Sequence, residues 1–147
     1  MFTTDVQTKI TEIQEINQAL DTLRSRGRTN RLARRALIAS ARGAGLSIAA
    51  IAETVGLSRN ALYKLGIPDT EVTPGFTCED ATRALAENRA ERLSIESDLN
   101  RHFLDRNKRI RQVFELDSSL EPSDIADHVG LSPNAIGDIK RGRIKTY

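Results

Sequence analysis

The sequence has few of the residues from which many binding and catalytic sites are built. It contains no tryptophan, four phenylalanines, two tyrosines, two histidines and one cysteine in 147 residues. So few aromatic side chains argue against an aromatic-lined surface for sugars or single-stranded nucleic acid. The single Cys78 excludes a disulfide within the chain and favours a reducing compartment. Neither His102 nor His128 has neighbours at metal-ligand spacing, so we expect no metal site.

Signatures of catalysis and of export are also missing. We find no Ser/His/Asp set, no paired carboxylates and no glycine-rich phosphate loop, and therefore expect no enzyme and no cofactor. The first residues do not have the basic-then-apolar order of a signal peptide, and no apolar run reaches membrane-spanning length. We expect a cytoplasmic, nucleoid-associated protein with no membrane partner.

The net charge is only +2, but the basic residues are clustered. One cluster is formed by Arg24, Arg26, Arg28, Arg31, Arg34 and Arg35, and a second by Lys140, Arg141, Arg143 and Lys145. Local basic clusters on a nearly neutral protein fit phosphate contacts at defined points better than general attraction to nucleic acid.

Apolar residues recur at helical spacing along the chain and no strand pattern occurs, which predicts an all-α fold. We expect a first helix from Thr4 to about Arg24, ended by Gly27, and a second from Thr29 or Asn30 to about Arg42. The first helix has Asn17 at a heptad core position, so part of its apolar stripe is a candidate seam for a homodimer. Packing of this stripe against the following helices is the leading prediction, with the homodimer seam as the alternative, and the connecting helix is a second candidate seam.

Composition shifts suggest five segments. Residues 66–77 hold two prolines and two glycines and resemble an interdomain linker. A long helix is expected from Cys78, with a break near Asp105–Asn107. The predicted ranges are 1–26 (amphipathic helix), 27–66 (first domain), 67–77 (linker), 78–104 (connecting helix) and 105–147 (second domain).

A short pattern occurs twice. Residues 51–65, "IAETVGLSRNALYKL", return without a gap 74 positions later as "IADHVGLSPNAIGDI", residues 125–139. The repeat favours two small units of similar fold. Each copy has a small residue (Ala52, Ala126), a glycine able to adopt a left-handed turn (Gly56, Gly130) and apolar residues at the spacing that holds two short helices together.

Residues 46–65 resemble the helix-turn-helix of the resolvase and invertase DNA-binding domain and of many bacterial and phage repressors. The resemblance implies that the second helix of each copy enters the major groove of DNA. Residues 1–45 are too few for the catalytic domain of a serine recombinase, so the resemblance extends to DNA docking and not to strand exchange.

The first copy is predicted to read bases with exposed residues of its second helix. These are Ser58, Arg59, Asn60, Tyr63 and Lys64. An arginine can donate two bonds to guanine, and an asparagine can bond adenine through both edge atoms. Ser58 is expected to cap the helix or to bind phosphate, and Tyr63 and Lys64 to contact either bases or phosphates. The candidate phosphate contacts on the preceding helix are Arg31, Arg34 and Arg35.

The second copy has fewer donors. Its candidate base-reading residues are Ser132, Asn134, Gly137 and Asp138, and its candidate phosphate contacts are Lys140, Arg141, Arg143 and Lys145. Because the core residues recur while the exposed ones differ, we expect the two units to read different sequences in a bipartite, non-palindromic site.

The predicted function is sequence-specific binding of double-stranded DNA, most simply by a bacterial or phage repressor or other transcriptional regulator. An architectural or recombination-accessory DNA-binding factor is the alternative in the same class. An adaptor that binds proteins through degenerate helix-turn-helix units is the alternative from another class, especially for the second copy.

Overall fold

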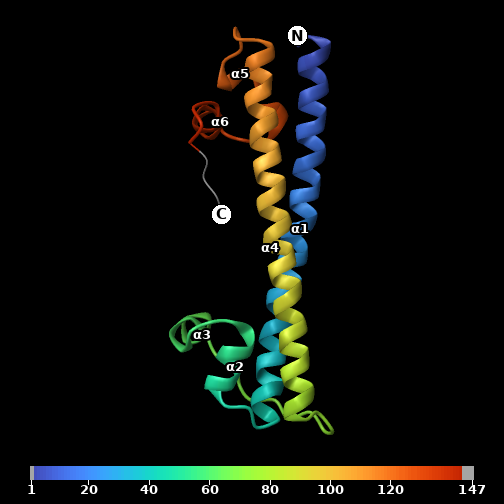
Figure 1. Ribbon diagram of the computed structural model, residues 1–147, viewed down its shortest axis with the longest axis vertical. Coiled ribbons are helices and arrows are strands. Elements are labelled where there is room, and N and C mark those ends of the chain that lie inside the picture. The colour runs from blue at the N-terminus through green and yellow to red at the C-terminus, as the bar shows by residue number, and fades with distance from the viewer. Residues whose placement is uncertain (1, 144–147) are drawn as a thin grey trace. The chain divides into compact units, whose positions relative to one another are not determined.

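The computed structural model describes residues 2–143, and the predicted phosphate contact Lys145 lies outside this range. All regular structure in the described residues is helical, which confirms the all-α prediction (Figure 1). The helices are α1 (Thr4–Gly43), α2 (Ile48–Val55), α3 (Arg59–Leu65), α4 (Cys78–Leu116), α5 (Pro122–Val129) and α6 (Pro133–Lys140). Within the described range, no helix has an apolar stretch of the length needed to span a membrane.

The helix α1 runs unbroken through Gly27, so the predicted helix end there is wrong. A glycine costs an internal helical position only about 1 kcal/mol relative to alanine, which packing readily offsets. Asn30 does not cap a new helix, because its side chain bonds another helix instead. Its Nδ2 donates to the Asn88 carbonyl at 3.1 Å, and Asn88 Nδ2 donates to the Asn30 carbonyl at 3.2 Å.

The helix α4 is also continuous, so the predicted break at residues 105–107 is wrong as well. The polar residues that suggested the break are buried in the packed helix. Arg106 is 7% exposed and Asn107 2% exposed. The Arg106 guanidinium lies 4.6 Å from the centre of the Phe103 ring, and its Nε and Nη2 donate to Asn107 Oδ1.

The chain forms two compact units that do not coincide with the five predicted segments. Unit 1 combines the chain up to Arg24 with the chain from Ser97 onward, and unit 2 is Ser25–Glu96. The expected linker is therefore part of unit 2. Its Glu71 N–H donates to the Ala39 carbonyl at 3.1 Å, and Arg42 Nη1 donates to the Pro68 carbonyl at 2.8 Å.

Each unit is built from both long helices. In unit 2, the end of α1 leads into α2 and α3, and the start of α4 packs against them. In unit 1, the end of α4 leads into α5 and α6, and the start of α1 packs against them (Figure 1). The buried core of unit 2 is Ile38, Ala41, Ile51, Ala52, Val55, Leu62, Ala81 and Leu85. That of unit 1 is Val6, Ile10, Ile13, Ile110, Val113, Phe114, Ile125, Ala126, Val129, Ile136 and Ile139.

The repeat therefore extends beyond the short pattern to the described helices. The start of α1 at Thr4 and of α4 at Cys78 are 74 positions apart, as are those of α2 at Ile48 and α5 at Pro122. The apolar stripe of α1 that suggested a homodimer seam is buried inside unit 1 at Val6, Ile10 and Ile13. Asn17 has a different role from the one predicted: its Nδ2 donates to the Val129 carbonyl at the end of α5, at 2.7 Å.

The turns that follow α2 and α5 both depend on a glycine. Gly56 and Gly130 have φ of +75° and +67°, in the left-handed region where a side chain is strained. The N–H groups of Gly56 and Leu57 both donate to the Ala52 carbonyl at 3.0 Å, and those of Gly130 and Leu131 donate to the Ala126 carbonyl.

We expect Gly130→Ala to lower the free energy of unfolding by about 1–3 kcal/mol, because the backbone conformation is costly for alanine. Gly56→Ala should cost a similar amount, because its Cβ would lie 2.7 Å from the Arg89 guanidinium carbon, which is the end of an exposed side chain and can move away. A Cβ added at Gly130 would have no atom within 4 Å, so the cost of Gly130→Ala comes from backbone strain alone. Chemical denaturation of the two variants measures both effects, and an unchanged midpoint for Gly130→Ala would contradict the role given to the turn.

Candidate nucleic-acid interface

The buried face of the α2–α3 pair fixes which side of α3 is exposed. Ser47 Oγ accepts from the Ala50 N–H at 3.1 Å, and Ser58 Oγ accepts from the Ala61 N–H at 3.0 Å, so each helix begins with a serine cap. Leu62 is 1% exposed and anchors α3 in the core of unit 2. The opposite side of α3 is therefore left on the surface.

That surface carries the side chains predicted to read bases in the first copy. Arg59, Asn60 and Lys64 are exposed, and Tyr63 is 57% exposed. In the part of the chain that the structure describes, no side-chain hydrogen bond or ion pair engages these four residues. Ser58 differs, since its hydroxyl is the cap of α3. The four side chains are available to a ligand, with two cations and one amide among them.

Of the three arginines of α1 predicted to contact phosphate, two are exposed. Arg31 and Arg35 lie on the surface, and Arg35 Nη1 donates to the Gly66 carbonyl at the end of α3, at 3.1 Å. Arg34 is only 8% exposed. Burial, together with the nearby charges of Arg92 and Arg31, lowers the pKa of the Arg34 guanidinium from its ordinary value. Its burial argues against a role in phosphate binding.

Two arginines of α4 that the sequence did not single out lie at the turn between α2 and α3. The Arg89 guanidinium covers Gly56, and Arg92 Nη2 donates to the Val55 carbonyl at 2.9 Å. Arg92 thus satisfies a carbonyl at the end of α2, as Asn17 does at the end of α5. Arg89 is exposed and adds a cation beside the turn. No sequence signal links these residues, because they are more than 30 positions apart.

The α5–α6 pair has the same local build but a different surface. Ser132 Oγ accepts from the Ala135 N–H at 3.1 Å, so this predicted base-reading residue is again a cap. Asn134 is exposed. Asp138 is engaged within the chain, since its Oδ1 lies 3.1 Å from Arg141 Nη2 and 3.9 Å from Arg143 Nη1. Gly137 is covered by the Arg141 guanidinium, 3.5 Å from where a Cβ would be.

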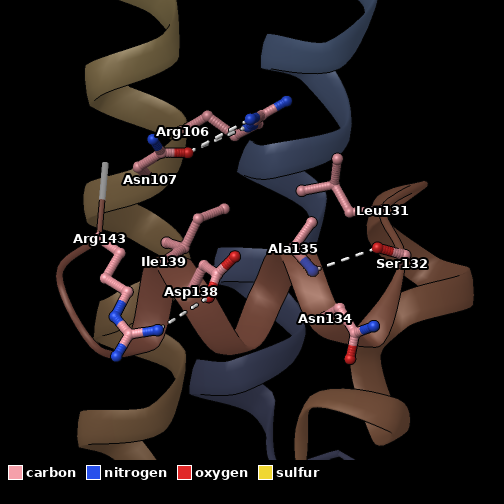
Figure 2. Close-up of a pocket in the computed structure, with 9 residues that line it drawn as sticks. All are labelled: Arg106, Asn107, Leu131, Ser132, Asn134, Ala135, Asp138, Ile139 and Arg143. Carbon is pink, nitrogen blue, oxygen red and sulfur yellow. Dashed lines mark hydrogen bonds and ion pairs between the residues drawn. The ribbon is translucent and has the colours of Figure 1, made fainter. Parts of the chain in front are cut away.

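A cleft of about 270 Å³ separates α6 from α4 in unit 1. Arg106 and Asn107 reach it from α4, and Asn134, Asp138 and Arg143 line it from α6 and the segment that follows (Figure 2). Asp138 is therefore directed toward this cleft and its arginine partners. The cleft shares residues with the predicted base-reading set and does not form a separate site.

The predicted phosphate contacts of the second copy that the structure describes already interact with other side chains of the protein. Lys140 Nζ lies 4.6 Å from the centre of the Phe114 ring, a favourable cation–π arrangement. Arg141 and Arg143 share Asp138, but both remain exposed, with side chains 59% and 72% accessible. The charge that this end of α6 presents is thus lower than the sequence suggests.

The greatest difference between the copies is the charge around their first helices. Residues 115–138 contain six acidic residues and no lysine or arginine. The corresponding residues 41–64 contain one acidic residue, Glu53, and three basic ones, Arg42, Arg59 and Lys64. The formal charges are −6 and +2. The α5 side therefore repels phosphate groups, and the α2 side does not.

No protein family, no curated protein and no solved structure matches this chain. The functional reading therefore depends on the geometry and chemistry of the two helical pairs.

Proposed function

We propose that this protein binds double-stranded DNA in a sequence-specific manner and acts as a transcriptional regulator, most simply a repressor, with α3 as its recognition helix. The observation that carries the proposal is the outer side of α3, where Arg59, Asn60, Tyr63 and Lys64 are exposed and without partners among the described residues. Arginine and asparagine can make bidentate contacts to guanine and adenine, and discriminate between bases through them.

Phosphate contacts beside α3 support the same orientation. Arg35 is bonded to the end of α3, and Arg31 is one helical turn away from it on α1. Arg89 lies at the turn before α3. Cations on both sides of a recognition helix can hold it in register on the backbone while the helix itself reads bases.

The bipartite site remains part of the proposal, with α6 as the weaker reader. Asn134 is its free base-reading group, whereas Asp138 is paired with arginines. The acids around α5 oppose phosphate approach. Selection of sites from a random duplex library separates the possibilities: two unlike half-sites support reading by both units, one half-site supports α3 alone, and a perfect palindrome contradicts the bipartite proposal.

The proposal is tested by the salt dependence of duplex binding. Each phosphate neutralised by lysine or arginine contributes about −0.9 to the slope of log K against log[salt]. We expect a slope of roughly −3 to −5, from three to five contacts around α3, and a preference for selected over scrambled duplex. A mobility shift that is absent even at low salt would refute DNA binding.

An adaptor that binds other proteins is the second candidate for unit 1 only. The observation that favours it is the acidic stretch around α5, which is unsuited to DNA and has no counterpart in unit 2.

A further inference from the structure

Two surfaces of the chain have opposite charges that are not neutralised locally. The acidic surface, in unit 1, is formed by the end of α4, the following turn and α5, which carry Glu115, Asp117, Glu121, Asp124 and Asp127 together with Leu116 and Leu120. The basic surface, in unit 2, consists of Arg28, Arg31 and Arg35 around Leu32. In residues 2–143 no ion pair with a residue of opposite charge involves any of these eight charged side chains.

Each surface also has an exposed apolar centre. Leu32 is 71% exposed, and Arg28 and Arg35 are its neighbours at helical spacing on α1, with Arg31 beside them at the same spacing from Arg28 and Arg35. Leu116 is 48% exposed at the end of α4, next to the half-buried Leu120. An apolar contact ringed by complementary charges is the usual composition of a specific protein interface.

We propose that the acidic surface of one copy of this protein docks on the basic surface of a second copy. Both surfaces belong to the same chain, so the two are always present in equal amounts. The contact joins different patches on the two copies, and is therefore heterologous. DNA cannot occupy the acidic surface, because its phosphates would be repelled there.

Self-association would also regulate access to DNA. Arg31 and Arg35 belong both to the basic surface and to the proposed phosphate contacts, so duplex DNA and a second copy compete for them. This competition depends on the proposed function, whereas the self-association does not.

Sedimentation velocity of the full chain from micromolar to millimolar concentration tests the association. We expect the average mass to rise with concentration at low salt and to fall when salt shortens the electrostatic range. Two double variants, Glu115→Arg with Asp127→Arg and Arg28→Glu with Arg31→Glu, should each associate at least about 10-fold more weakly. All four residues are exposed and none caps a helix, so both variants should retain their helical circular dichroism.

The decisive measurement is a mixture of the two charge-reversed variants. Each variant alone has lost one of the two surfaces. In the mixture, the unchanged acidic surface of the Arg28→Glu/Arg31→Glu variant meets the unchanged basic surface of the Glu115→Arg/Asp127→Arg variant, and association into pairs should return. A wild-type chain that stays monomeric at every concentration overturns the proposal, as does association that both reversals leave unchanged. Adding the selected duplex to the associated protein distinguishes the two proposals. If the protein self-associates but binds no duplex, the self-association proposal stands and the DNA-binding function is refuted.

Discussion

Leu85→Ala is expected to lower the free energy of unfolding by about 2–5 kcal/mol, and to weaken α2 and α3 more than α5 and α6. Leu85 is fully buried in the core of unit 2, where it packs with residues of α1, α2 and α3. Removing its three terminal carbon atoms leaves a cavity that the neighbouring helices fill only in part. Amide hydrogen exchange, read residue by residue, measures which helices lose protection.

Ile10→Ala is the matched variant. Ile10 lies 75 positions before Leu85, is also fully buried, and packs in unit 1 with α5 and α6. We expect a cost of similar size, with the loss of protection now concentrated in α5 and α6, which are more than 110 positions away in the sequence. Leu93→Ala, at a position of α4 that is 47% exposed, serves as the surface control.

The two variants test how the long helices are shared between the units. If Ile10→Ala instead lowered the amide protection of α2 and α3, which follow α1 directly in the sequence, the start of α1 would pack in unit 2 and not in unit 1. Equal loss in all four short helices from either variant would mean that the chain unfolds as one cooperative unit.

The short helices could be predicted closely from the sequence, because their ends are set by local chemistry. Ser47, Ser58 and Ser132 cap helices where the pattern placed them, and Pro122 and Pro133 begin α5 and α6. The glycine turns at Gly56 and Gly130 follow in the same way. Each of these signals depends on residues within four positions of one another.

The long helices could not be predicted, because their continuity depends on distant partners. Gly27 and Asn30 are ordinary helix-ending signals, but Ile95 of α4 lies beside Gly27 and the Asn88 carbonyl accepts a hydrogen bond from the Asn30 amide. The predicted break near Asp105–Asn107 is absent, because Arg106 and Asn107 are buried against Phe103 and each other. The exchange of long-helix segments between the units has no local signature at all.

At the candidate site, the positions of the exposed side chains could be predicted from the sequence, but their pairings could not. The outward placement of Arg59, Asn60, Tyr63 and Lys64 follows from helical spacing around Leu62. The pairing of Asp138 with Arg141 and Arg143, the burial of Arg34 and the placement of Arg89 over Gly56 depend on side-chain contacts. That these pairs bind DNA remains a prediction.

Arg59→Ala is expected to weaken binding to the selected duplex by about 1–3 kcal/mol, or roughly 5- to 150-fold, and to relax the preference at one base pair. The reason is that the lost guanidinium would otherwise make two bonds to one guanine in the major groove. Because Arg59 is exposed and contributes no contact to the core, the fold should be unaffected. Equilibrium binding to the selected duplex and to its single-base variants measures both effects.

Arg31→Ala is the control for contact with the backbone alone. Arg31 is exposed on α1 and is not part of the recognition helix, and its loss should weaken all duplexes by a similar factor and reduce the salt slope by about one. The two variants therefore differ in the pattern of loss across sequences and not merely in its size. If Arg59→Ala weakened binding to all duplexes equally, Arg59 would contact the phosphates and not a base. The base-reading candidates left on α3 would then be Asn60, Tyr63 and Lys64. An Arg59→Ala protein with full affinity and unchanged preference would exclude α3 as the recognition helix.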